Sequence, residues 1–436
     1  MFSLHETTKI HLCRIAFFAT CLAPTCAVLA WGALVRLPSY TRAHELAIAE
    51  GLGLHAQLAK ASSPRPGLML YEALELSDPD TRQPLARFPF VEVQTSGDAV
   101  YVSLPFPAMI NGTRLDAFWN AVRHSVRPSR GWRELHFTSG NLTIHLPTGD
   151  QSFTALTGRI DNTEEHARVQ LSLRRAVSGS QPAEAAELTV ERQWQSAPQA
   201  TLVQLNTGGT PLPCSLVASI WPDVETLGGA SEFQGRIVAF EQAGRTKTEL
   251  SGRLTGVDFD RLVSGQFPHK LTGRATAELD LMTIEDGRLE TAAGKIKSGP
   301  GAISRSLVRS AQSNLNLHGS KEFHAPGEGL VAYGEMNFAF KINREGLSLR
   351  GESPTVKGAL LIDDRRRLLL GEPTGLVQPV VNLARTLVPQ SQVQVPATRE
   401  TAALIRALPV PSALPAVEGQ EPAAQARRLR VVPKPQ

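Results

Sequence analysis

The sequence predicts a mostly β fold: a curved antiparallel sheet, shaped as a groove and built from short repeats, with an N-terminal transmembrane helix and a few inserted helices. Three observations predict it. Residues 15–35 carry no charged side chain. Much of the remaining chain consists of short segments in which apolar and polar residues alternate, as they do in half-buried strands. A pattern of an apolar residue, any residue, glycine and a basic residue also recurs along the chain.

The composition excludes several classes of protein. The chain has 436 residues, of which 42% are hydrophobic and 20% charged, so neither a disordered chain nor a multi-span transporter fits. A net charge of +4 is too close to balance for a nucleic-acid-binding protein. Of the four cysteines, Cys13, Cys21 and Cys26 lie in or beside the apolar run, which leaves only Cys214 in the body. A disulfide framework or a cysteine-ligated zinc site is therefore excluded.

Residues 15–35 are long enough to cross the ~30 Å hydrocarbon core of a membrane as a helix. The alternative is a cleaved signal peptide, for which Ala30–Ala33 offers small residues. We favour a retained anchor, because the apolar run exceeds a signal-peptide core and the bulky Trp31 interrupts the small-residue site. Residues 1–14 then form a short cytoplasmic head, and the long body lies outside the cytoplasm.

The body divides into four predicted segments. We expect a juxtamembrane helix within residues 36–62, closed by Gly51 or Gly53. A β-rich domain follows at residues 63–370, interrupted by a helical insert at residues 302–314 with Ser304 as its N-cap. Residues 371–408 are predicted to form C-terminal helices, and the basic tail rich in proline and alanine, residues 409–436, is predicted to be disordered.

One predicted hairpin lies within Arg133–Leu146, where the alternation continues on both sides of Ser139-Gly140-Asn141. A second hairpin turn is predicted at Asp286-Gly287.

The repeat is predicted near residues 156–160 and across residues 233–297. Its glycines are Gly158, Gly235, Gly252, Gly273 and Gly294, and the last three lie 21 residues apart. We expect stacked two-strand units in which Gly252, Gly273 and Gly294 are equivalent and curve the sheet. The alternative is a large antiparallel domain in which the Gly-basic pairs are coincidental.

In order along the chain, several features resemble the AsmA-like family, part of the superfamily of bridge-like lipid transfer proteins. An anchor and helix precede Ser63-Pro-Arg-Pro-Gly67, and Leu74-Glu-Leu-Ser-Asp-Pro-Asp-Thr81 is similar to the step that follows the family's anchor helix. Leu271-Thr-Gly-Arg-Ala-Thr-Ala-Glu-Leu279, Asp286-Gly-Arg-Leu289 and Gly299-Pro-Gly-Ala-Ile-Ser-Arg-Ser-Leu307 also resemble the family. The resemblance covers residues 15–370.

The resemblance implies an inner-membrane protein with one span and a periplasmic β-rich groove, acting in outer-membrane biogenesis or phospholipid movement. The chain is short for a bridge between two membranes. We expect no enzymatic activity, because no motif supplies a nucleophile with its base or a metal-ligand spacing, and no catalytic residue, metal or cofactor is expected. An alternative is a structural accessory of a secretion or envelope-assembly apparatus, with protein partners there.

The expected partner is a phospholipid acyl chain, and the candidate groove residues lie in one alternating segment: Ala275, Ala277, Leu279 and Leu281. Small alanines beside larger leucines would leave room for a chain above the sheet. The alternative is that this face is packed core.

Overall fold

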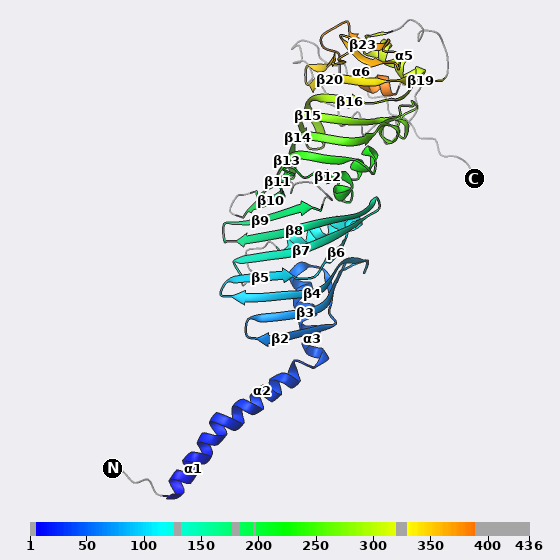
Figure 1. Ribbon diagram of the computed structural model, residues 1–436. Coiled ribbons are helices and arrows are strands. Elements are labelled where there is room, and N and C mark those ends of the chain that lie inside the picture. Colours follow the sequence, from blue (N-terminus) through cyan, green and yellow to red (C-terminus); the bar gives the residue numbers. More distant parts are fainter. Residues whose placement is uncertain (1–5, 126–131, 177–183, 195–197, 320–328, 389–436) are drawn as a thin grey trace, which may run out of the picture.

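The computed structural model describes residues 6–125, 132–176, 184–194, 198–319 and 329–388. One large, mostly antiparallel sheet of 21 strands dominates the molecule, and a two-stranded sheet accompanies it. The strands stack one above another from β2, beside the N-terminal helix, to β23 (Figure 1). We call the β2 end proximal and the β23 end distal. The predicted mostly β class with a large curved antiparallel sheet is confirmed.

The N-terminal helix projects away from the sheet (Figure 1) and is continuous through α1 (Glu6–Phe17), a π-helical turn (Phe18–Leu22) and α2 (Ala23–Leu34). Its stretch Arg14–Leu34 is 21 residues long, apolar, and not buried against the rest of the protein, so it could cross a membrane once. The π turn precedes Pro24, which has no N–H to donate to the preceding turn. Thr20 and Thr25 satisfy their hydroxyls on helix carbonyls, as a lipid environment requires.

Helix α3 (Pro38–Leu52) follows and ends because Gly53 adopts the left-handed conformation, with φ 68°. The helix predicted within residues 36–62 is present, and it closes at Gly53, one of the two glycines expected to end it. The rest of that segment is not helical. Strand β1 already begins at His55 and β2 at Lys60. Helix α3 lies against the proximal strands, where Tyr40 and Ile48 pack on the proximal core.

The proximal elements are β1 (His55–Gln57), β2 (Lys60–Arg65), β3 (Leu68–Ser77), β4 (Pro84–Ser96), β5 (Ala99–Leu104), β6 (Ala108–Asn111), a 3₁₀ turn (Gly112–Arg114) and α4 (Leu115–Ser125). The middle strands are β7 (Glu134–Leu146), β8 (Gly149–Asn162), β9 (His166–Arg175), β10 (Ala186–Gln193), β11 (Ala200–Asn206), β12 (Leu212–Pro213), β13 (Glu232–Gln242) and β14 (Arg245–Asp258). Short 3₁₀ turns at Cys214–Val217 and Pro222–Leu227 precede β13, and a π turn at Asp260–Ser264 follows β14.

The distal elements are β15 (Arg274–Glu285), β16 (Arg288–Ser298), β17 (Gly301–Ser304), α5 (Arg305–Asn314), β18 (Leu317–Gly319), β19 (Leu330–Tyr333), β20 (Glu335–Asn343), β21 (Gly346–Gly351), β22 (Ala359–Ile362), β23 (Leu368–Pro373) and α6 (Val381–Leu387). The Asp286-Gly287 turn and the Ser304 cap are confirmed, since the Ser304 hydroxyl accepts the N–H of Leu307. Of the C-terminal helices, α6 is present, and residues 389–436, with the predicted second helix and tail, lie outside the described residues.

The Ser77-Asp78-Pro79-Asp80 turn ties the proximal sheet to the segment before α4. The Asp78 carboxylate accepts the backbone N–H groups of Asp80 and Thr81 and forms an ion pair with Arg114. The hydrogen bond from Thr81 is the largest cause that lowers the pKa of the Asp78 carboxyl, although burial opposes it. The motif quoted for the family resemblance therefore has a structural role in this chain.

The predicted hairpin within Arg133–Leu146 is wrong, because these residues form the single strand β7. It pairs with β8 over its whole length and runs parallel to β5 and β6, with α4 as the crossover. Ser139 is buried before Gly140, and every second residue from Leu142 onward is buried after it, so the alternation of buried and exposed positions shifts by one residue at Gly140. On β8 the register shifts beside Ala155, which has φ 52°. A kink in paired strands thus gives the same sequence pattern as a turn.

The glycines of the predicted repeat are not equivalent. Gly235, Gly252 and Gly294 lie in one cross-strand row, in which Leu279 separates the last two. Gly273 instead precedes β15, and Gly158 lies in β8, far from this row in the sheet. The 21-residue spacing therefore does not mark a repeated position, because Gly252 and Gly294 belong to strands two apart in the sheet.

The close approach of neighbouring backbones explains why glycines occupy this cross-strand row. A Cβ on Gly252, which has φ 141°, would collide with the Gln234 carbonyl oxygen, and one on Gly294 would collide with the carbonyl oxygen of Glu278.

We predict that Gly252→Ala lowers the free energy of unfolding by about 1–3 kcal/mol, because alanine is strained at this φ and meets backbone atoms. Gly140→Ala is the matched control: it also lies in a strand, but nothing lies within 4 Å of its added Cβ. Its effect should be below about 0.5 kcal/mol. Urea unfolding of the detergent-solubilised full chain measures both, and equal effects would contradict the close-approach explanation.

Candidate functional site

The register of the sheet places apolar residues in one continuous cross-strand row. Each member is the direct register partner of the next, and we call this row the apolar ladder. It consists of Phe137, Gly158, Leu171, Leu188, Leu205, Ile237, Leu250, Met282, Ala292, Ile342 and Leu347. The row crosses β7 to β11, β13 to β16, β20 and β21, so ten strand spacings of ~4.8 Å give it a length of roughly 48 Å.

The opposite face of the same strands is polar. The neighbouring cross-strand row consists of Arg159, Gln170, Thr189, Gln204, Val238, Glu249 and Thr283. Because successive side chains of a strand point to opposite faces, the two rows belong to different sides of the sheet. Along these strands one face is thus apolar and the other mostly polar.

Burial varies along the apolar ladder. Phe137 packs on the proximal core, and Ile342 and Leu347 are buried in the distal core. Leu171, Leu188, Leu205, Ile237 and Leu250 are only half-buried. Between the two cores, part of the row is covered by α4, whose Trp119 and Val122 pack beside Leu171 and Leu188 in a small cluster.

The ladder ends distally in an apolar cavity of about 340 Å³. Its lining is entirely hydrophobic and includes the ladder residues Ile342 and Leu347. Phe338, Phe340 and Leu349 line it from the same sheet face. Leu307 of α5 and Leu383 of α6 line it from the helices. This volume falls in the range of small-molecule sites, about 300–1,000 Å³, and an apolar cavity favours an apolar occupant over water.

A buried polar cluster holds α5 and α6 together beside this cavity. The Thr386 carbonyl on α6 accepts a hydrogen bond from the Ser310 hydroxyl at 2.8 Å and lies 3.0 Å from His269 Nε2, which donates to it. The other ring nitrogen of His269 lies 3.0 Å from the Ser306 hydroxyl. Burial lowers the pKa of the His269 imidazole, and the hydrogen bond to Thr386 opposes the shift. A neutral imidazole thus links the two helices.

The structure divides the four predicted groove residues between the two faces. Ala275 and Leu279 are buried and Ala277 is half-buried, and all three lie on the face of the apolar ladder, with Leu279 in the row next to it. Leu279 shares a row with the cavity residues Phe340 and Leu349.

Leu281 does not share this face. The β15–β16 register passes from Leu279 to Leu281 across a bulge, so Asp280 is the extra residue and the alternation reverses. Met282 takes the apolar position, and Leu281 is 45% exposed. Grouping Leu281 with the other three is therefore corrected.

Within the described residues, no group of three or more His, Cys, Asp or Glu side chains is placed to hold a metal ion. His136 stacks on Tyr101 and His145 pairs with Asp150, so each has a local partner. What this face offers chemically is continuous apolar surface.

Sequence reasoning placed the groove in β15, but none of its four residues belongs to the ladder, and it missed the cavity. The short alternating segments of β9 to β11 carry the necessary signal, but only the pairing register shows that Leu171, Leu188 and Leu205 are aligned.

Protein-family models, curated proteins and solved structures were each compared with this chain, and none matches it. The AsmA-like interpretation therefore rests on the sequence motifs alone.

Because of the bulge in β15, substitution of Leu279 and of Leu281 should lower the free energy of unfolding by different amounts. We predict that Leu279→Ala lowers the free energy of unfolding by about 2–4 kcal/mol, because it removes a buried side chain. Leu281→Ala should cost less than about 1 kcal/mol, because this side chain is largely exposed. Urea unfolding of both variants tests the assignment, and a larger loss for Leu281→Ala would contradict it.

Protonation of His269 should weaken the link between α5 and α6. Its pKa is lowered in the folded state, so the unfolded state binds the proton more tightly and stability falls as pH drops through about 6.5. We predict that wild type loses more stability between about pH 7.5 and 5.5 than His269→Gln, which keeps a donor and does not titrate. Parallel stability profiles of the two proteins would contradict this role.

Proposed function

We propose that this is a membrane-anchored AsmA-like protein that binds phospholipid acyl chains along the apolar ladder and moves lipid during outer-membrane biogenesis. The observation that carries the proposal is the continuity of the ladder. A row of apolar side chains roughly 48 Å long connects the proximal core to the distal cavity, and its middle residues are only half-buried.

The energetics favour an acyl chain as occupant. Each buried methylene contributes about 0.8 kcal/mol, so ten methylenes laid on the ladder would gain at most about 8 kcal/mol before the cost of ordering the chain. A charged or strongly polar ligand would gain nothing from this face and would lose its hydration. The hydrophobic lining of the distal cavity supports the same choice.

The position of the N-terminal helix determines how the sheet would be oriented relative to the membrane in this proposal. The N-terminal helix joins the proximal end of the sheet, and elements that line the distal cavity, among them β20, α5 and α6, lie at the other end (Figure 1). In the proposed arrangement the helix sits in the inner membrane, the sheet stands in the periplasm, and lipid moves along the ladder away from the membrane. In this proposal the protein acts without catalysis.

Native mass spectrometry of the detergent-purified full chain tests the proposal. We predict that wild type retains phospholipid and that Leu205→Glu reduces the retained lipid about tenfold, since a charge on the ladder is costly beside an acyl chain. Leu205 is half-buried and belongs to none of the four buried clusters of the described residues, so the variant should fold.

Gln204→Glu is the matched control, because it adds the same charge to the adjacent residue on the polar face. It should retain lipid as wild type does. A folded wild-type protein without lipid, or equal losses in both variants, would overturn the proposal.

A further inference from the structure

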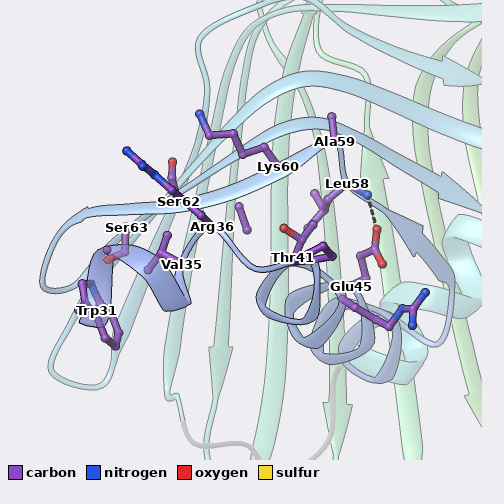
Figure 2. Close-up of a pocket in the computed structure, with 14 residues that line it drawn as sticks. Trp31, Val35, Arg36, Thr41, Glu45, Leu58, Ala59, Lys60, Ser62 and Ser63 are labelled. Atoms are coloured by element: carbon purple, nitrogen blue, oxygen red, sulfur yellow. Dashed lines mark hydrogen bonds between the residues drawn. The ribbon is translucent and has the colours of Figure 1, made fainter. Parts of the chain in front are cut away.

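A second cavity, of about 710 Å³, lies where the N-terminal helix meets the sheet. Figure 2 shows its lining: Trp31 and Arg36 come from the end of the helix and the residues after it, Glu45 from α3, and Lys60 and Ser62 from β2. The side chains of Arg36 and Lys60 extend toward the same side in this view. The cavity thus joins the end of the span to the proximal edge of the sheet.

The charges of this cavity favour an anion. Arg36, Arg42 and Lys60 line it against a single acidic residue, Glu45, which leaves a formal excess of two positive charges. The Glu45 carboxylate already has a hydrogen-bond partner, since it accepts the backbone N–H of Leu58 at 2.8 Å.

The three basic side chains differ in their partners. Lys60 forms an ion pair with Glu72 at 3.1 Å. Arg36 and Arg42 make no ion pair within the part of the chain that the structure describes, and both are exposed. Two guanidinium groups therefore remain available, and guanidinium forms strong bidentate hydrogen bonds with phosphate.

The backbone adds to this preference. Helix α3 begins beside the cavity, has no side-chain cap at Leu37 and carries no acidic residue in its first turn. Its partial positive charge is therefore not offset locally.

The position of the cavity identifies the source of the anion. The apolar span ends at Leu34, and Arg36 follows within two residues. Trp31 is 55% exposed near the same end, where an indole ring suits the boundary between hydrocarbon and headgroups. A helix that crosses a membrane would therefore hold this cavity at the level of the phospholipid phosphates.

We propose that this cavity binds the headgroup of an anionic phospholipid from the membrane that holds the helix. Arg36 and Arg42 contact its phosphate, and Trp31 contacts the apolar part next to the headgroup. The proposal goes beyond acyl-chain binding by the apolar ladder and does not require it.

The test uses the full chain in detergent micelles, where membrane orientation has no influence. Native mass spectrometry measures retention of phosphatidylglycerol and phosphatidylcholine with identical acyl chains, offered in equal amounts. Wild type should favour phosphatidylglycerol, and R36Q/R42Q should lower the ratio of retained phosphatidylglycerol to phosphatidylcholine to about one. R236Q/R245Q is the control, because it removes the same charge from exposed residues of β13 and β14 and should keep the wild-type preference.

Three outcomes would overturn the proposal: equal retention of the two lipids by wild type, equal losses in the two double variants, or displacement of phosphatidylglycerol by inorganic phosphate alone. The last result would identify a free-phosphate site. Leu205→Glu separates the two proposals, since it should lower total lipid and leave the preference for the anionic headgroup unchanged.

Discussion

Backbone hydrogen bonds join 21 strands into one sheet, and their register determines which side chains share a face. A shift of one residue between two neighbouring strands would move every later side chain to the opposite side. The apolar ladder exists because the pairs from Phe137 to Leu347 keep one register across bulges in β14 and β15. At the bulge in β15, the extra residue Asp280 places Met282, rather than Leu281, on the apolar face.

The same constraint explains why the molecule needs helices at its ends. A single sheet leaves apolar side chains exposed unless another element covers them. Helices α3 and α4 pack on the proximal core, and α5 and α6 pack on the distal core. The buried cluster of His269, Ser310 and Thr386 fixes the distal helices. Between the two ends, the half-buried ladder residues leave surface on which the proposed acyl chain would lie.

Local signals in the sequence predicted much of this fold. The span, the helix before the sheet, the turn at Asp286-Gly287 and the cap at Ser304 each depend on residues close together in the chain. The errors arose where different structures share one local pattern. A phase change at Gly140 resembles a hairpin turn, and the equal spacing of Gly252, Gly273 and Gly294 resembles a repeat.

The candidate site was less predictable. Ala275, Ala277 and Leu279 lie on the same face as the ladder, but the ladder itself depends on pairings that no short segment encodes. The second cavity likewise depends on folding that brings the end of the N-terminal helix, α3 and β2 together around it. Strand β2, which supplies one wall of this cavity, was not predicted from the sequence.

The claim that lipid follows the ladder can be tested most directly by photo-crosslinking in native membranes. A photoreactive amino acid is placed in turn at Leu188 and Leu250 on the ladder, and at the adjacent Thr189 and Glu249 on the polar face. The account predicts lipid adducts at the two ladder positions, with little or none at the two polar positions. Equal labelling of both faces, or labelling of the polar face alone, would contradict it.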